Sequence, residues 1–350
     1  MPAFPAWWIL PPFDKPQKTS IDMVQVLIIG GAGMLGRKLA ERLSADGQIG
    51  GKAISRLHLA DMFTPTAPAG APFEVTTTTG DFSEAGEAER LIADRPEIIF
   101  HLAAIVSGEA EADFDKGYRI NLDGTRLLLD AIRAAGNYHP RLVFTSSIAV
   151  FGAPFPSEIP DEFHHTPLTS YGTQKAIGEL LLSDYSRRGI LDGVGIRLPT
   201  ICVRPGKPNK AASGFFSGII REPLNGMEAI LPVPTDVRHW FASPRAAVQF
   251  MVHAATIDTA KVGPRRNLTM PGVAATVAEE IESLRRIAGE AAVKLIRHEP
   301  DATIMGIVKG WPQAFSPERA LSLGFAADTD FDAIVRLYIE EELGGKIATA

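Results

Sequence analysis

The 350-residue sequence is poor in cysteine, in long apolar runs and in excess positive charge, and each shortage excludes a class of protein. Its single cysteine, Cys202, cannot form an internal disulfide, and its apolar surroundings predict a buried, inert thiol. No stretch approaches the roughly 20 uninterrupted apolar residues that span a bilayer. The formal net charge of -6 offers nucleic acid no broad basic face. We therefore expect a soluble, cytoplasmic protein that binds neither membrane nor nucleic acid, and we predict no metal site.

The first 22 residues differ from the rest of the chain. They are interrupted by prolines and lack both a basic n-region and a long apolar segment, so they are neither a signal peptide nor a membrane span. A strand-like run begins at Met23. We predict that residues 1–22 form a disordered tail or come from an upstream mis-start.

From Met23 onward, short β-branched runs alternate with longer segments of helical period. This alternation predicts an α/β fold, a doubly wound parallel sheet of the Rossmann type. After residue 200 the pattern loosens into a proline- and glycine-rich connection and then into mixed short elements. We predict a Rossmann domain over 23–200 and a smaller, mixed α/β substrate lobe over 201–350, with some elements of the lobe returning to the first domain.

A glycine-rich turn follows the first predicted strand. It contains Gly30 and Gly33 directly after the run VLII, and Gly36 at the start of a helix that begins with Met34 and Leu35. A pyrophosphate needs close backbone approach and the free N–H groups of a helix N-terminus, and this segment supplies both. A glycine turn that only packs a helix onto a sheet is the alternative interpretation.

Asp61 ends the second predicted strand, where a carboxylate can accept hydrogen bonds from the adenosine ribose and repel a phosphate. This favours NAD over NADP. Arg37 and Lys38 could serve a 2'-phosphate, but we expect them to be solvated, and Asp61 could also simply cap a turn. Other residues at strand ends are expected to line the same cofactor site; they are Asp81, Phe82, Leu102, Ala103, Ala104 and Pro199. His101 is expected to be a core histidine rather than a catalyst.

Tyr171 and Lys175 form the strongest chemical signal, because positions i and i+4 of a helix share one face. An ammonium beside the phenol, together with a positive nicotinamide ring, is expected to lower the tyrosine pKa so that Tyr171 can accept a proton. Lys175 can also hold the nicotinamide ribose. Upstream, a predicted strand ends in FTSS, and Ser147 is our choice for the hydroxyl that binds the substrate oxygen, with Ser146 as the alternative.

Through GGAGMLG, GDF, HLAA, NLDGT, FTSSIAVFG and YGTQK, the sequence resembles the extended short-chain dehydrogenase/reductase superfamily from Met23 nearly to the C-terminus. The resemblance implies a Ser/Tyr/Lys trio matching Ser147, Tyr171 and Lys175, a structural or proton-relay asparagine matching Asn121, and a homodimer.

Many members of this superfamily act on nucleotide sugars, and VRHWFASPRAA resembles the segment in which an arginine, here Arg238, contacts the substrate diphosphate. The later arginine of that clamp has no counterpart around Lys309 and Trp311. The runs MVQVLIIGGAGMLG and RLPTICVRPGKPNKAASGFFSGIIREPLNG instead resemble the D-erythronate dehydrogenases. That resemblance implies NAD-dependent oxidation of a small sugar acid, with Arg204 or Arg238 binding its carboxylate and Ser107, Ser147 and Tyr171 its hydroxyls.

Two alternatives remain open from the sequence. A nucleoside-diphosphate-sugar epimerase would use Tyr171 and Lys175 to oxidise and re-reduce one carbon, and would retain its NAD. A non-catalytic NAD-sensing regulator could share the fold, although such a protein can dispense with the tyrosine.

Overall fold

The computed structural model describes residues 23–206 and 212–348. The predicted tail, residues 1–22, lies outside the described residues. So do 207–211, in the connection predicted after residue 200, and 349–350.

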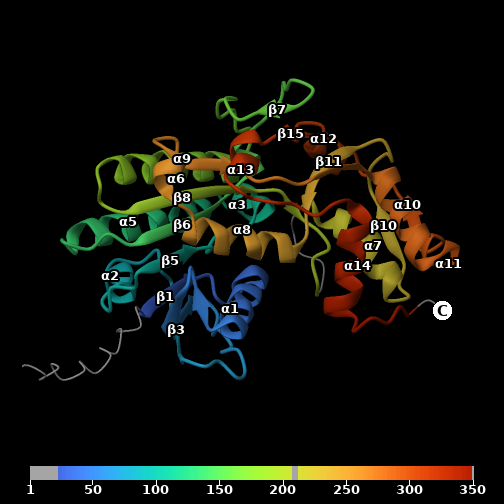
Figure 1. Ribbon diagram of the computed structural model, residues 1–350. Coiled ribbons are helices and arrows are strands. Elements are labelled where there is room, and N and C mark those ends of the chain that lie inside the picture. The colour runs from blue at the N-terminus through green and yellow to red at the C-terminus, as the bar shows by residue number, and fades with distance from the viewer. Residues whose placement is uncertain (1–22, 207–211, 349–350) are drawn as a thin grey trace, which may run out of the picture.

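The main layer is an eight-stranded sheet with the order β12-β8-β6-β5-β1-β3-β2, in which β4 pairs with β3 (Figure 1). All of its strand pairs are parallel except the short β2–β3 hairpin. The strands are β1 (Met23–Ile29), β2 (Gln48–Ile49), β3 (Lys52–Asp61), β4 (Glu74–Thr79), β5 (Ile98–His101), β6 (Arg141–Ser147), β8 (Asp192–Leu198) and β12 (Asn267–Thr269). The predicted doubly wound fold is confirmed.

Helices cover both faces of this sheet, and the side chains of β1 show why. Val26 and Ile28 join the core on the side of α1 (Met34–Asp46) and α8 (Pro244–Thr256). Leu27 and Ile29 join the core on the side of α2 (Glu87–Leu91), α5 (Gly124–Ala134) and α6 (Ser170–Arg187). Since alternate residues of a strand point to opposite faces, a continuous apolar run is what a strand buried on both sides requires.

The segments after β5 and β6 are broken into short elements. After β5 the chain forms α3 (Ser107–Ala112), α4 (Phe114–Gly117) and a π-helical turn, η1 (Tyr118–Asp123). After β6 come a 3₁₀ turn, η2 (Ile148–Val150), and β7 (Ile159–Pro160).

The C-terminal lobe has its own core, built mainly from two small sheets, β13-β11-β9 and β10-β14, and the helices around them. Its elements are β9 (Thr200–Ile201), α7 (Gly214–Leu224), β10 (Ala229–Leu231), β11 (Arg238–Ala242), β13 (Val273–Thr276), α10 (Val277–Ala288), α11 (Glu290–Val293), β14 (Ile296–His298), α12 (Ala302–Val308) and α14 (Phe331–Glu342). Helices α9 (Thr259–Val262) and α13 (Glu318–Ser322) instead contribute Val262 and Ala320 to the core beside α1 and α8, and β15 (Phe315–Ser316) pairs with β7. Cys202 is buried in the core of the lobe, and burial raises the pKa of its thiol, as expected for an inert cysteine.

Strand β12 and helix α8, also from beyond residue 200, belong to the large sheet layer. Strand β12 pairs with β8, and α8 packs against β6 and β8. A cut at residue 200 would separate both from the sheet that they complete, and the division into 23–200 and 201–350 stays a prediction.

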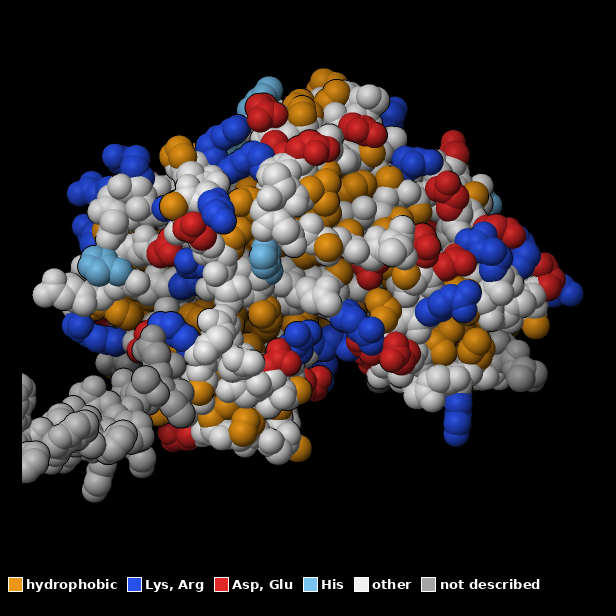
Figure 2. All heavy atoms as spheres, in the orientation of Figure 1, with side chains coloured by type: hydrophobic (Ala, Val, Ile, Leu, Met, Phe, Trp, Pro, Cys, Tyr) orange, Lys and Arg blue, Asp and Glu red, His pale blue; other side chains and the backbone are white. Residues whose placement is uncertain are grey.

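The surface of the described residues carries charges of both signs. On the face shown in Figure 2, lysine and arginine side chains lie among aspartates and glutamates. In the described part of the chain, no helix combines the length and the apolar character needed to cross a membrane.

Candidate active site

The turn between β1 and α1 brings three backbone segments into close contact. Gly30 has a φ of +100°, and a Cβ atom on it would lie 2.7 Å from the backbone nitrogen of Ala103. A Cβ atom on Gly36 would collide with the carbonyl oxygen of Gly30. Gly33 caps α1 without a side-chain hydrogen bond. The turn itself therefore requires glycine at positions 30 and 36, and α1 begins at this turn with a helix N-terminus, which is the element that a pyrophosphate site uses.

A cavity of about 440 Å³ opens at this turn. Most of the predicted cofactor residues line it, namely Gly30, Gly33, Asp61, Asp81, Phe82, Leu102, Ala103 and Ala104. Met34, Leu35 and Gly36 form the first turn of α1 beside it, and Pro199 is buried between β8 and β9. The glycine cradle, the helix N-terminus and the carboxylate at the end of β3 together fit the adenosine and pyrophosphate of NAD.

The Asp61 carboxylate joins the end of β3 to the glycine turn. It accepts hydrogen bonds from the backbone nitrogens of Ala32, at 3.0 Å, and Phe63, at 3.2 Å. The turn-capping interaction that we considered as an alternative is therefore present. The same carboxylate lines the cavity, so capping does not exclude contact with a ribose.

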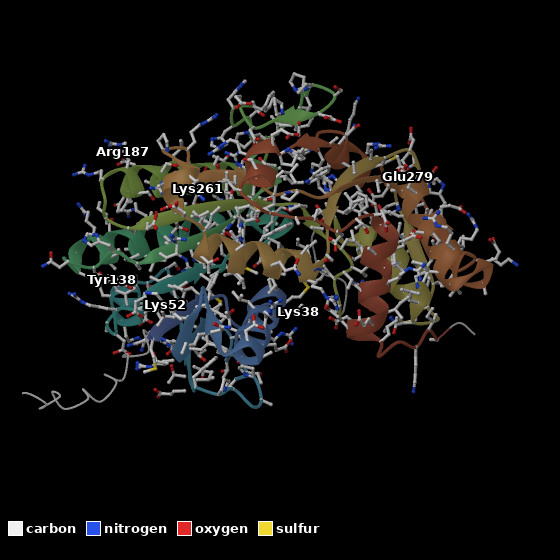
Figure 3. All side chains as sticks on the ribbon, viewed as in Figure 1. Lys38, Lys52, Tyr138, Arg187, Lys261 and Glu279 are labelled. Carbon is white, nitrogen blue, oxygen red and sulfur yellow. The ribbon has the colours of Figure 1, made fainter. Side chains whose placement is uncertain are left out.

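Lys38 is not solvated, contrary to expectation. Its ammonium lies 3.0 Å from the carboxylate of Glu341 and 2.5 Å from that of Glu342, at the end of α14, and its side chain is only 19% exposed. Burial opposes the charge, but the two carboxylates outweigh it and raise the pKa of Lys38. Figure 3 shows Lys38 on the side of α1 toward α14. Since these carboxylates neutralise Lys38, the exposed Arg37 is left as the cation that could approach a 2'-phosphate.

Asp81 is held by an arginine that the sequence did not reveal as a partner. Its carboxylate accepts hydrogen bonds from the backbone of Ser83, at 3.1 Å, and from Nη1 of Arg119 in η1, at 2.7 Å. Burial raises the pKa of Asp81, but these hydrogen bonds outweigh it and hold the pKa below its ordinary value. Asp81 therefore presents an ionised carboxylate at the edge of the cavity.

The three predicted catalytic residues lie where β6 ends, at Ser147, and where α6 begins, at Tyr171 and Lys175. Lys175 is buried, donates from Nζ to the carbonyl oxygen of Thr145 at 2.9 Å, and lies 5.8 Å from the ring centroid of Tyr171. The Ser147 hydroxyl lowers the pKa of Tyr171, and it also accepts a hydrogen bond from the backbone nitrogen of Ala149 at 3.1 Å. Thr169 caps α6 by accepting from the Gly172 nitrogen at 3.0 Å, which fixes the first turn that carries the tyrosine.

In the chain without NAD, Lys175 does not lower the pKa of Tyr171, and the lowering expected from Lys175 together with the nicotinamide ring stays a prediction. Burial raises the pKa of Tyr171 to about 12, and the opposing effects come from the Ser147 hydroxyl and the charge of Arg204. Burial also lowers the pKa of Lys175 to about 8, against the charge of Glu179. The sequence shows that the two side chains share a helix face, but the cost of desolvation depends on packing around them.

Ser146, the alternative to Ser147, forms a hydrogen bond with a different group. Its hydroxyl donates to Oε1 of Glu179 at 2.5 Å. The same fully buried carboxylate lies 2.8 Å from Nη2 of Arg197 and 2.7 Å from Nε2 of His165. The sequence analysis missed this cluster, although Glu179 stands one helical turn after Lys175 and the four-residue spacing could have indicated it.

Asn121 is a structural link in this fold. Its amide nitrogen donates to the carbonyl oxygen of Ile105 at 3.2 Å and to Oε1 of Gln174 at 2.8 Å, and its amide oxygen accepts from the Ile105 nitrogen at 2.9 Å. It therefore joins the segment after β5 to α6. Of the two roles that the resemblance implies, these contacts account for the structural one.

His101 is a buried core histidine, as expected. Its Nε2 forms a hydrogen bond with Oγ1 of Thr125 at 2.9 Å. Burial, and to a lesser degree the charge of Lys175, lowers the pKa of His101 to about 3, so the ring is neutral near pH 7.

Of the two arginines nominated for substrate binding, Arg204 lies near the tyrosine. Its charge acts on the pKa of Tyr171, and its backbone is fixed by Ser217 and Arg221 of α7 at 3.0 and 2.8 Å. Burial, then Arg221, lowers the pKa of Arg204, and Tyr171 opposes them; among the described residues no carboxylate contributes. The guanidinium is thus a partly buried cation without a described carboxylate partner.

Arg238 and Ser107 are placed differently. Arg238 begins β11 and lies 3.7 Å from the carboxylate of Glu279, which Figure 3 places on α10 of the lobe. Ser107 is the first residue of α3, and its neighbour Gly108 lines a second cavity together with Phe215 of α7. Arg238 therefore already has a counter-charge, whereas Ser107 stands at the boundary between the two lobes.

Comparison with known proteins agrees with this geometry. Residues 26–264 match the NAD dependent epimerase/dehydratase family. A D-erythronate dehydrogenase of Cupriavidus necator is 48% identical over 324 residues, 91% of this chain and 98% of that protein. One from Haemophilus influenzae is 41% identical over 320 residues, 91% of this chain and all of that protein. A solved structure described as the nucleoside-diphosphate-sugar epimerase from Agrobacterium tumefaciens is 62% identical, with a TM-score of 0.92, and the match covers 96% of this chain and 99% of that one.

These matches confirm the resemblance to the extended short-chain dehydrogenases and show that the protein is an enzyme with NAD as its cofactor. The family match spans the glycine turn, Asp61, and the Ser147, Tyr171 and Lys175 group. The chain belongs to the NAD dependent epimerase/dehydratase family.

Proposed function

We propose that the protein oxidises a small 2-hydroxy sugar acid of the D-erythronate type to the 2-oxo acid, with NAD as the electron acceptor. The observation that carries the proposal is Arg204, a partly buried guanidinium whose charge acts on the pKa of Tyr171 and on which no described carboxylate acts. A substrate carboxylate bound to Arg204 would bring the adjacent C2 hydroxyl toward Tyr171. The two relatives named D-erythronate dehydrogenase support this substrate class.

In this reaction each residue has a separate task. Ser147 binds the substrate hydroxyl oxygen, and Tyr171, as phenolate, takes the hydroxyl proton. Lys175 holds a positive charge beside the tyrosine and supplies donors for a ribose. NAD, when bound, accepts the hydride from C2. One hydroxy acid and one NAD thus give one 2-oxo acid, one NADH and one proton.

The same proposal assigns the cofactor contacts. The glycine turn and the first turn of α1, which contains Met34 and Leu35, would hold the pyrophosphate, and Asp61 would accept from the adenosine ribose. The pairing of Lys38 with α14 supports NAD over NADP, because it removes one cation from competition for a 2'-phosphate. The homodimer is part of the proposal and rests on the family resemblance.

A nucleotide-sugar epimerase is the second candidate, because the Agrobacterium tumefaciens structure carries that description. A diphosphate substrate calls for at least two cationic contacts. In this chain Arg238 lies beside Glu279 and is 41% exposed. Because Arg238 already has a carboxylate beside it, Arg204 is the nominated arginine without one among the described residues, which favours a smaller substrate with a single negative charge.

The test is to mix the purified protein with NAD and a panel of four-carbon aldonates, including D-erythronate and L-threonate, and to follow NADH absorbance. We expect NADH with one acid. Silence across the panel, with NAD already bound after purification and turnover of a nucleotide sugar, would establish the epimerase instead.

A matched pair of variants tests the role of Arg204. Arg204→Gln should raise KM for the acid by roughly 10- to 100-fold, the loss expected for a charged hydrogen bond. Arg238→Gln makes the same change at an arginine that is already paired, and should leave KM near the wild-type value. Equal effects of the two substitutions, or none at Arg204, would contradict the assignment.

A further inference from the structure

Glu179 is a fully buried carboxylate for which the proposed reaction has no task. It lies on α6 one turn beyond Lys175, as Lys175 lies one turn beyond Tyr171. These three side chains therefore follow one another along the face of α6 that packs on β6 and β8.

The carboxylate of Glu179 is surrounded by donors. Arg197 of β8 donates from Nε at 2.9 Å and from Nη2 at 2.8 Å, Ser146 donates at 2.5 Å, and Nε2 of His165 lies at 2.7 Å. Burial raises the pKa of Glu179, but the charge and hydrogen bonds of Arg197 and His165 outweigh it and lower the pKa. Glu179 is therefore ionised inside the protein.

Few groups stabilise the charged form of Lys175. Its ammonium has three donors, and one of them is bound to the Thr145 carbonyl oxygen. It also lies 4.9 Å from the ring centroid of Phe144, which is an apolar neighbour on β6. Such a site penalises the charged form of a lysine, and the negative charge of Glu179 opposes this penalty.

The other ionisable groups around Lys175 do not stabilise its ammonium. On α6 its neighbour Tyr171 is protonated, because burial raises its pKa to about 12. From β5, His101 is neutral near pH 7, with a pKa lowered to about 3. Arg197 on β8 and His165 contact the Glu179 carboxylate, and neither acts on the pKa of Lys175. Among the described residues, Glu179 alone contributes a Coulombic effect to the pKa of Lys175.

We propose that Glu179 is a positioning residue of the active site: its buried charge keeps the Lys175 ammonium protonated, while Arg197 and Ser146 hold that charge in place. The inference rests on the proposed function only in taking Lys175 as an active-site group. Glu179 is not among the residues that line the cavity, and its charge acts on the pKa of Lys175, so Lys175 is the group through which it acts on the site.

The experiment measures the protonation of Lys175 directly, without cofactor or substrate. Full-length protein is labelled with carbon-13 at the lysine Cε, the Lys175 signal is assigned by its absence in Lys175→Arg, and pH is varied. The wild-type signal should titrate near pH 8. In Glu179→Gln the midpoint should fall by about one to three pH units, the effect of losing an adjacent opposite charge.

Two further variants separate charge from packing. Arg197→Lys changes the packing and hydrogen bonds of the same cluster but keeps the positive charge that ionises Glu179, so the Lys175 midpoint should stay near the wild-type value. Ser146→Ala removes a hydrogen bond without a change of charge, and should also leave the midpoint near the wild-type value. An unchanged midpoint in Glu179→Gln, or a fall of similar size in Arg197→Lys, would overturn the proposal.

If Glu179→Gln does not fold, the double variant Glu179→Gln with Arg197→Gln removes both buried charges together. Its Lys175 midpoint should lie below the wild-type value, because Glu179 acts on the Lys175 pKa and Arg197 does not, and an unchanged midpoint would again overturn the proposal. The result is independent of the substrate. A failed aldonate panel with a lowered Lys175 midpoint would refute the proposed reaction and leave the role of Glu179 intact.

Discussion

The ionisation of Tyr171 should depend on NAD. In the chain by itself, burial raises the tyrosine pKa from 10.0 to about 12. This rise corresponds to about 2.7 kcal/mol against the phenolate. At pH 9 only about one molecule in a thousand would then carry the phenolate that the proposed reaction needs. We therefore expect the free enzyme to keep Tyr171 protonated throughout the neutral range.

A cation placed within a few ångströms lowers a phenol pKa by about one to three units. Saturating NAD, with its positive nicotinamide ring, should therefore bring the ionisation of Tyr171 down by that amount. The assay is the tyrosinate absorbance difference between wild type and Tyr171→Phe, recorded against pH with and without NAD. Subtracting the variant removes the contribution of the other tyrosines, including the buried Tyr138, whose pKa is also raised by burial.

The outcome is decisive in both directions. A difference signal that rises near pH 10 or lower without NAD would show that burial does not control Tyr171, and would refute the reasoning. The charge of Arg204 gives an internal check, because it lowers the Tyr171 pKa. In Arg204→Gln the signal should therefore move to still higher pH.

Three other changes have expected results. Tyr171→Phe should lower kcat by roughly 10²- to 10⁴-fold, the usual worth of a positioned base, while NAD affinity by calorimetry stays near wild type; normal turnover would reject Tyr171 as the base. Asp61→Asn should weaken NAD binding by about tenfold and reduce the enzyme's preference for NAD over NADP, because a charged hydrogen-bond acceptor is lost. An unchanged ratio of the two affinities would show that Asp61 serves only the turn at Ala32. Glu280 is fully buried without a hydrogen-bond partner among the described residues, and burial raises its pKa well above 4.5. The folded state therefore holds this proton more tightly than the unfolded chain, so Glu280 destabilises the protein progressively as pH rises above 4.5 toward the folded-state pKa. Urea unfolding should show Glu280→Gln gaining stability over wild type across this range, and a constant difference would contradict the burial argument.

The sequence by itself determined the features that depend on local geometry. Gly30 and Gly36 could be recognised because a positive φ and a close helix approach each demand glycine, and both demands are set within a few residues. Tyr171 and Lys175 could be paired because the helical repeat alone puts positions i and i+4 on one face. The alternation of buried strands and helices likewise predicted the doubly wound sheet.

Only the tertiary structure decided the pKa of these groups and which of two adjacent serines faces the active site. Ser146 and Ser147 are adjacent in the sequence, but the strand directs Ser146 to Glu179, 33 residues away, and leaves Ser147 for Tyr171. Lys38 finds its partner Glu341 303 residues away on α14. Burial raises the pKa of Tyr171 in the chain without NAD, which the sequence could not show, because desolvation depends on everything packed around a group, and packing is a property of the whole fold.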